Sequence, residues 1–329
     1  MDSELLDLLR TSVRHVLMSA DTTPIGERLI ELGWRDVVAD APAAALKMLF
    51  EVRGDTLSPA GVLDVVLTDR LAELSSCEGA SGRALLLAPT LRDVCPSGRL
   101  TDGRVDIDGV ALSPVEPGAP VVVSMGAPDG AVRLGLVNVP HGARVCRING
   151  MDPSLGLTAV TALVPARDVE WIDGRVAQLF DEIVALGRCA LSAELLGLAR
   201  HMVANAVQYA CDRRQYGRPI GSFQAVQHRL ADAHAAIVGA DAVLTEVFAE
   251  RSSFGATVAK ALAGRAFEEA SRQSQQVYGA IGFTWEHEFH RYLRRGYVLD
   301  TLFGDWRTLQ VEIGTEVLET QRVPRVGSL

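Results

Sequence analysis

The chain has 329 residues, of which 48% are hydrophobic and 22% charged, a composition typical of a globular protein with a sizeable buried core. Its formal net charge of −9 argues against nucleic-acid binding, because proteins that bind nucleic acid non-specifically need a cationic face. No run of about 18 apolar residues occurs and the first residues lack a basic region followed by an apolar one, so neither a membrane-spanning helix nor a signal peptide is expected.

The cysteines and histidines predict neither disulfides nor a metal site. The five cysteines are scattered and form no CxxC pair, which is typical of reduced thiols in a cytoplasmic protein. His287 and His290 lie three residues apart, but no third ligand accompanies them at metal-binding spacing.

The first part of the chain predicts a small helical domain over residues 1–78. Apolar residues recur there at helical spacing in several segments, which glycine or proline separates. The predicted helices cover residues 3–19, 25–32, 43–52 and 58–74.

The pattern changes at Gly79, where short runs rich in β-branched and aliphatic residues begin. Between residues 84 and 171 these runs are separated by Gly, Pro and Asp at turn-like intervals. This sequence pattern predicts a compact β domain, either a barrel or a sandwich, over residues 79–173.

Helical spacing returns at residue 174 and continues through the rest of the chain. Residues 178–211 carry few charges and a stripe of small residues, which indicates a long helix buried on most sides. Three further helices are predicted at residues 223–250, 256–280 and 306–319. Long helices with short connections predict a four-helix bundle over residues 174–329.

The segment between the first two of these helices is unusual. Residues 212–227 read Asp-Arg-Arg-Gln-Tyr-Gly-Arg-Pro-Ile-Gly-Ser-Phe-Gln-Ala-Val-Gln, and the glycines and proline interrupt both helices. A helix–helix turn needs only one or two glycines. Taken alone, the segment could be a solvated basic turn, but its arginines, tyrosine and spaced glutamines call for a further explanation.

Two later motifs supply that explanation. Residues 276–284 read Gln-Val-Tyr-Gly-Ala-Ile-Gly-Phe-Thr, and Arg294-Arg295 is followed by Leu-Phe-Gly-Asp at 302–305. In this order and spacing the three motifs resemble the acyl-CoA dehydrogenase family, flavoproteins that desaturate an acyl-CoA between its α and β carbons. The resemblance implies an α+β fold with a shortened N-terminal helical domain, a central β-barrel or sandwich domain and a C-terminal four-helix bundle.

The resemblance also implies a set of FAD contacts. Arg213 matches the family arginine that binds the FAD pyrophosphate of a neighbouring subunit, and a guanidinium fork suits a phosphate bidentately. Small residues in the second motif match the segment that cradles the adenosine half, where they let the backbone approach the ligand. The other expected FAD contacts are Tyr216, Gln224, Gln276, Gly279 and Ala280.

The catalytic residue of the family is missing. The reaction needs a carboxylate in a desolvated pocket, where a raised pKa lets it take the α-proton of the thioester. Most members carry this glutamate in a Glu-Gly-Thr segment, and the matching residues here are Phe303, Gly304 and Asp305. A minority of members carry it one position before the residue that matches Arg188, and this chain has Gly187 there. We therefore expect no catalytic residue in this chain.

Two further departures concern the FAD of the chain's own subunit. Asp305 replaces a threonine that lies near that cofactor in the family, and its carboxylate should repel the phosphates. The Thr-Glu-Pro and Gly-Ser-Asp segment that walls the flavin is replaced by residues 84–91. The chain thus keeps what serves a neighbour's FAD and lacks what serves its own.

The sequence therefore resembles the base-less subunit of actinobacterial α2β2 acyl-CoA dehydrogenases of steroid and cholesterol catabolism. This implies FAD-dependent β-oxidation chemistry on a bulky acyl-CoA, such as a steroid side-chain CoA thioester, in a widened pocket shared with a homologous partner subunit. Two alternatives stay open. One is an autonomous enzyme with Glu286 or Glu194 as a relocated base, and the other is a structural subunit that binds no flavin.

Overall fold

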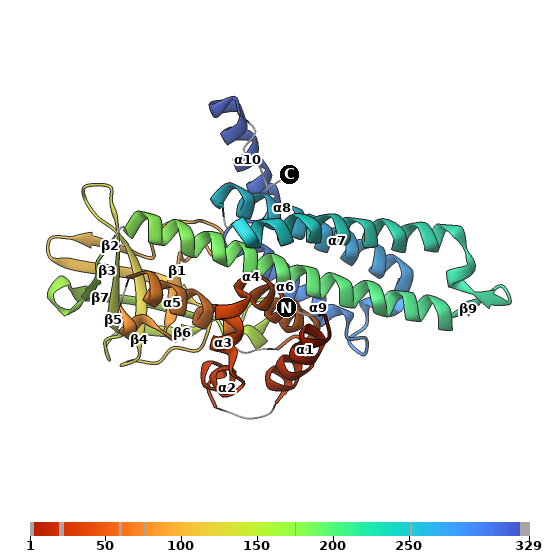
Figure 1. Ribbon diagram of the computed structural model, residues 1–329, viewed down its shortest axis with the longest axis horizontal. Coiled ribbons are helices and arrows are strands. Elements are labelled where there is room, and N and C mark those ends of the chain that lie inside the picture. Colours follow the sequence, from red (N-terminus) through yellow and green to blue (C-terminus); the bar gives the residue numbers. More distant parts are fainter. Residues whose placement is uncertain are drawn as a thin grey trace.

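Along the chain, helices come first and last and a sheet forms between them, in a computed structural model. In space the sheet lies at one end of the molecule and the long C-terminal helices extend to the other (Figure 1). This order, with a long helical C-terminal part, confirms the predicted acyl-CoA dehydrogenase-like fold class. Among the residues described, no helix is both long and apolar enough to cross a membrane. The structure describes residues 3–19, 23–58, 61–75, 77–174, 176–250 and 252–322.

In the described part of the chain, five α-helices precede the sheet, and the fourth of them packs most deeply. Residues Ala45 to Gly54 of α4 include nine buried positions, and the helix crosses the long helix α6 at two glycines. A Cβ at Gly54 would lie 2.2 Å from the backbone oxygen of Glu194, and one at Gly197 would lie 2.3 Å from that of Glu51. The two backbones can therefore meet only because neither glycine carries a side chain. The helices are α1 (Ser3–Met18), α2 (Ile25–Glu31), α3 (Trp34–Asp40), α4 (Pro42–Thr56) and α5 (Val62–Ser75).

The middle of the chain forms one eight-stranded sheet in the order β6-β7-β3-β1-β4-β5-β8, with β2 paired to both β3 and β4. The pairs β1–β4 and β2–β4 are parallel and the others antiparallel. A second hydrophobic core, which includes Ile107, Val121 and Val123, lies among its strands. The strands are β1 (Ala84–Leu87), β2 (Gly98–Thr101), β3 (Arg104–Ala111), β4 (Pro120–Gly126), β5 (Val132–Asn138), β6 (Arg144–Arg147), β7 (Thr158–Pro165) and β8 (Glu170–Ile172).

Helix α6 is the long central helix against which most of the other helices pack. Its 37 residues run from the sheet to the far tip of the helical half (Figure 1), and it packs against α4, α5, α7, α8 and α9. Helix α10 stands away from the body and buries only Leu309 among its residues. The helices of this half are α6 (Val176–Asp212), α7 (Gln224–Glu250), α8 (Ser253–Tyr278), α9 (Phe289–Thr301) and α10 (Trp306–Thr320).

Some predicted helices differ from those observed. The helix predicted from residue 58 begins at Val62, and its predicted proline start, Pro59, lies outside the described residues. Helices α3 and α9 were not predicted from the sequence. The apolar residues of α9 do recur at helical spacing, with Phe289, Tyr292 and Leu299 on its buried face, so the signal for this helix was present among its arginines.

Candidate functional site

The two positions where the family carries its base contact each other. Gly187 lies on α6 and Phe303 lies in the loop between α9 and α10, and a Cβ added at Gly187 would lie 2.8 Å from Cε2 of the Phe303 ring. Phe303 is only 5% exposed, so its ring fills the space above the glycine. Neither position offers a carboxylate, and the Phe303 ring leaves no room for a side chain at Gly187.

The loop that carries Phe303 is held by polar contacts from three elements. The N–H of Phe303 donates to the backbone oxygen of Leu91 at 3.1 Å, and Arg188 Nε donates to the oxygen of Phe303 at 3.1 Å. Lys260 Nζ donates to the oxygen of Gly304 at 3.2 Å. These bonds keep Phe303 in a left-handed conformation, with φ of 57°, which a phenylalanine rarely adopts.

Buried charges surround this loop. Lys260 is fully buried, and burial lowers the pKa of its ammonium to about 8 although the Asp300 carboxylate lies 3.6 Å away. Burial also raises the pKa of Asp300 above its usual range, against the opposing charge of Lys260. Arg188 is buried and donates to both carboxylate oxygens of Glu312 at 3.2 Å. These charged side chains hold the loop in place, because they bond to its backbone or to each other.

The cavity beside Phe303 is small and apolar. It has a volume of about 30 Å³, which is on the scale of one or two water molecules. Asp93, which accepts a hydrogen bond from Thr90, supplies the one carboxylate of its lining. A flavin ring system is far larger than this cavity. The widened acyl pocket shared with a partner subunit stays a prediction. The lining includes Leu85, Leu87, Leu91, Phe180, Ile183 and Val184.

Asp305 has a structural role. Its carboxylate accepts hydrogen bonds from the N–H groups of Arg307 and Thr308, both at 3.1 Å, and thereby caps the first turn of α10. It also pairs with Arg92 at 2.9 Å. Burial would raise the pKa of this carboxyl, but the Thr308 and Arg92 contacts bring it below its usual value. The expected repulsion of FAD by Asp305 is therefore reduced, because a neighbouring cation offsets the charge.

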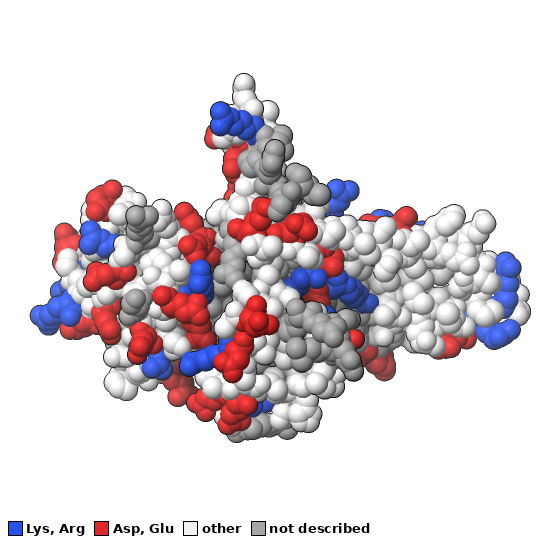
Figure 2. Space-filling view, in the orientation of Figure 1, with Lys and Arg blue, Asp and Glu red and all other residues white. Residues whose placement is uncertain are grey.

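The predicted FAD-binding loop forms a short hairpin at the far tip of the helical half (Figure 1). Strands β9 (Arg214–Gln215) and β10 (Arg218–Pro219) pair across a two-residue turn in which Tyr216 has φ of 51° and Gly217 has φ of 79°. Figure 2 shows basic residues gathered at this tip. Arg213 is exposed and pairs with no carboxylate among the described residues, and Tyr216 is 93% exposed.

The second FAD motif lies at the same end of the bundle. Tyr278 closes α8, and its ring contacts that of Tyr209 on α6 at a centroid distance of 5.3 Å. The N–H of Arg213 in turn donates to the oxygen of Tyr209 at 2.8 Å. Gly279 follows with φ of 61° and open space where a Cβ would lie. Gln224, Gln276 and Ala280 are exposed.

These side chains fit part of an FAD. A free guanidinium suits the pyrophosphate, the exposed amides can hydrogen-bond the adenosine half, and the open backbone at Gly279 allows close approach. They do not reach the chain's own base positions. Gly187 and Asp212 are separated by 25 residues of continuous helix, which corresponds to roughly 38 Å at about 1.5 Å per residue.

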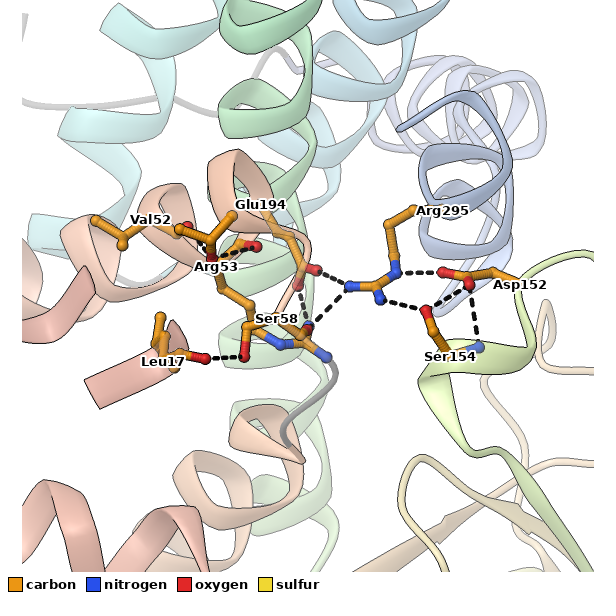
Figure 3. Close-up of polar contacts among 9 residues, drawn as sticks. Leu17, Val52, Arg53, Ser58, Asp152, Ser154, Glu194 and Arg295 are labelled. Atoms are coloured by element: carbon orange, nitrogen blue, oxygen red, sulfur yellow. Dashed lines mark hydrogen bonds and ion pairs between the residues drawn. The ribbon is translucent and has the colours of Figure 1, made fainter. Parts of the chain in front are cut away.

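Neither candidate for a relocated base suits that role. Glu194 is fully buried, ion-paired with Arg53 and 3.5 Å from Arg295 (Figure 3), and it does not line the cavity beside Phe303. Glu286 is exposed, and hydrogen bonds to its own backbone N–H and to Thr284 lower the pKa of its carboxyl. A base for this proton needs a raised pKa in a desolvated pocket, so both placements argue against an autonomous enzyme.

The network around Glu194 was not predicted from the sequence. Arg295 on α9 ion-pairs with Asp152 and donates to Ser154 Oγ at 3.0 Å and to the backbone oxygen of Ser58 at 3.2 Å (Figure 3). It therefore joins the N-terminal helices, the β region and the bundle at one point. The signal in the sequence was a charged residue, Glu194, inside an almost wholly apolar helix.

The histidines of the 285–290 segment contact aromatic rings. His287 lies 4.3 Å from the Tyr278 ring centroid and His290 lies 4.6 Å from that of Trp285. Across the part of the chain that the structure describes, no group of three or more His, Cys, Asp or Glu side chains could hold a metal ion.

Known proteins resemble this chain in sequence. The family model described as "Acyl-CoA dehydrogenase, C-terminal domain" matches residues 178–313. Acyl-CoA dehydrogenase IpdE2 of Mycolicibacterium smegmatis is 29% identical over 331 residues, which cover 96% of this chain and 99% of that protein. IpdE2 of Mycobacterium tuberculosis is 36% identical over 130 residues, 40% of this chain and 41% of that protein. Acyl-CoA dehydrogenase FadE34 of Mycobacterium tuberculosis is 32% identical over 233 residues, which cover 66% of this chain and 32% of that protein.

Solved structures share the fold. A structure described as "Tcur3481-Tcur3483 steroid ACAD G363A variant" superposes with a TM-score of 0.76 at 22% identity, over 97% of this chain and 99% of that chain. The ChsE4-ChsE5 complex from Mycobacterium tuberculosis gives 0.75 at 22% identity, over 98% of this chain and 97% of that chain. Residues 178–313 therefore belong to the C-terminal domain family of acyl-CoA dehydrogenases, whose members are FAD-dependent oxidoreductases that act on CH–CH groups.

Proposed function

We propose that this chain is the base-less subunit of a heteromeric acyl-CoA dehydrogenase. In this proposal a homologous partner subunit carries the flavin ring and the catalytic glutamate, and this chain contributes the pyrophosphate and adenosine half of the FAD site. The contributed residues are Arg213, Tyr216, Gln224, Gln276, Gly279 and Ala280. The reaction is the α,β-desaturation of a bulky acyl-CoA.

The contact between Gly187 and Phe303 carries this proposal. Both positions that could hold the base are apolar, and the ring of one fills the space of the other. A carboxylate introduced at Gly187 would meet the ring before it reached the cavity. The chain therefore lacks the group that removes the α-proton, although it keeps an exposed set of FAD-binding side chains.

The distance along α6 supports a role for these side chains at a neighbouring subunit. Roughly 38 Å of continuous helix separates the base positions from the hairpin. Because a helix does not bend sharply, the hairpin of one chain cannot contact a ligand bound at the base positions of the same chain. The hairpin projects at the tip of the bundle, where a second subunit can approach it (Figure 1).

The relatives support a heteromer and a bulky substrate. The ChsE4-ChsE5 complex names two different chains, and the Tcur3481-Tcur3483 structure is described as a steroid enzyme. By analogy, we infer an α2β2 assembly with a homologous acyl-CoA dehydrogenase subunit and a steroid side-chain CoA thioester as the substrate.

Flavin content tests the proposal. The chain is produced alone and together with a homologous subunit that retains the Glu-Gly-Thr segment, and each purified sample is measured for bound FAD and for dye reduction by an acyl-CoA. We expect a colourless single chain and a yellow complex with one FAD per pair of unlike chains. A yellow, active single chain overturns the heteromer.

Two variants separate a flavin role from a purely structural one. Arg213→Ala should weaken FAD binding by the complex at least tenfold, because a charge-assisted bond to a phosphate is lost. Arg167→Ala is the matched control, since Arg167 is 86% exposed on the β region. A stable complex that binds no FAD would instead identify a flavin-free structural subunit.

A further inference from the structure

The hairpin at the bundle tip has two distinct faces. Gln215 pairs with Arg218 and Arg214 pairs with Pro219, while the N–H of Ile220 donates to the oxygen of Arg213 at 2.8 Å. Because successive side chains of a strand alternate between faces, Arg213 and Arg218 share one face and Arg214 lies on the other. Arg213 and Arg218 are diagonal neighbours across the pair, a separation of about 7–8 Å that long side chains can span.

Arg218 is oriented by an aromatic ring. Its guanidinium carbon lies 4.1 Å from the centroid of the Phe223 ring, and Phe223 in turn contacts the ring of Tyr216 edge-on at 6.2 Å. Stacking fixes the guanidinium plane and leaves its N–H edge available to an acceptor. No carboxylate within the described ranges pairs with Arg218.

Arg214 is directed elsewhere. It donates from Nη2 to the backbone oxygen of Gly217 at 3.4 Å, within its own turn. Three arginines thus lie within six residues of sequence, but only two of them face the same way. Among the described residues no carboxylate pairs with Arg213 or Arg218, so an anion with two charged groups at a matching separation could bind both.

We propose that Arg218 is a second phosphate ligand of the FAD site, with Arg213 and Arg218 each taking one phosphate of the pyrophosphate. This inference rests on the proposed function, because the pyrophosphate belongs to an FAD held mainly by the partner subunit. The two negative charges of the pyrophosphate match the two guanidinium groups, and the ring of Phe223 reduces the entropy lost when Arg218 binds. Arg214 takes no part.

Four variants of the assembled complex test this assignment. FAD dissociation constants are measured by flavin fluorescence for Arg213→Ala, Arg218→Ala, Arg214→Ala and Phe223→Leu, at about 0.15 M and again at higher salt so that distant charges are screened. We expect Arg218→Ala to raise the dissociation constant roughly tenfold, as for the loss of one charge-assisted bond. Arg214→Ala should change it less than about twofold, and Phe223→Leu should weaken binding by an intermediate factor.

The outcomes distinguish the two proposals. If Arg213→Ala releases FAD and Arg218→Ala does not, the inference fails and the proposed function stands. If neither releases FAD, both fail. Coenzyme A also carries phosphates, so acyl-CoA affinity is measured in the same variants. A loss of acyl-CoA affinity on Arg218→Ala without loss of FAD would overturn the FAD assignment. If Arg214→Ala and Arg218→Ala raise the FAD dissociation constant equally, Arg218 contributes only non-specific positive charge and the inference fails.

Discussion

The packing of Phe303 against Gly187 makes a quantitative prediction for stability. Gly187→Ala adds a Cβ at 2.8 Å from Cε2 and 3.1 Å from Cζ of the Phe303 ring. Phe303 cannot move freely, because its N–H and its oxygen are both hydrogen-bonded and it is almost fully buried. Overpacking of this kind costs about 1–3 kcal/mol. The substitution also gains about 0.5–1 kcal/mol, because alanine favours the interior of a helix over glycine.

A double-mutant cycle separates these two contributions. Phe303→Ala removes the ring, so in that background Gly187→Ala should stabilise the chain by about 0.5–1 kcal/mol, the helix term alone. The helix term is the same in both backgrounds and cancels in the cycle. The interaction energy between the two substitutions should therefore equal the overpacking cost, about 1–3 kcal/mol.

Urea unfolding of the four proteins, followed by circular dichroism, measures this energy. The slopes of the four transitions should agree, since a change in slope would indicate a change in the surface exposed on unfolding. An interaction energy below about 0.5 kcal/mol, with equal slopes, would refute the contact between the two base positions. Leu186→Ala on the same helix is a comparison that should show no such coupling to Phe303→Ala.

Three further outcomes follow, two from buried charges and one from the cap of α10. Arg295→Met leaves Glu194 and Asp152 without a cation they pair with, so the free energy of unfolding should fall by about 3–5 kcal/mol in urea titrations, and a fall below about 1 would contradict the ion pairs. Burial lowers the pKa of Lys260 from 10.5 to about 8, so the unfolded chain binds more protons between these values and stability should rise by about 3 kcal/mol across that pH window. Lys260→Met should flatten that rise relative to wild type, and an unchanged profile would exclude a buried charge. Asp305→Ala removes the cap of α10 and should lower the free energy of unfolding by about 0.5–2 kcal/mol, which thermal unfolding beside a conservative Asp305→Asn variant can measure.

The order of elements could be predicted from the sequence because its signals are local. The apolar spacing of α6 and the alternation along the strands are visible within a window of ten to twenty residues. Helix α9 was missed although its apolar residues recur at helical spacing, because it is short and rich in arginine, and it is stabilised by tertiary contacts such as those of the buried Arg295. Propensity alone does not report such contacts.

In the candidate site, too, the local motifs could be predicted from the sequence and the contacts between distant residues could not. The FAD-binding segments are contiguous motifs, so Arg213 and Gln276 could be identified from the order of residues, although their assigned roles remain predictions. The absence of a base at Phe303 and Gly187 was also visible. That these two residues touch was not, because they lie more than a hundred positions apart and meet only through the packing of α6 and the α9–α10 loop. The role of Asp305 as a cap likewise depends on where α10 begins.

The contrast between the two ends of α6 gives the strongest argument for a role at a partner subunit. At the sheet end, Arg188 and Lys260 bond to the backbone of the loop that carries Phe303, and the cavity is lined mostly by apolar side chains. At the tip, Tyr216 is 93% exposed and the guanidinium of Arg213 pairs with no carboxylate among the described residues, so these side chains add little to the stability of the isolated chain. Folding explains the residues at the first end. For the residues at the second end we propose a ligand that lies outside the chain.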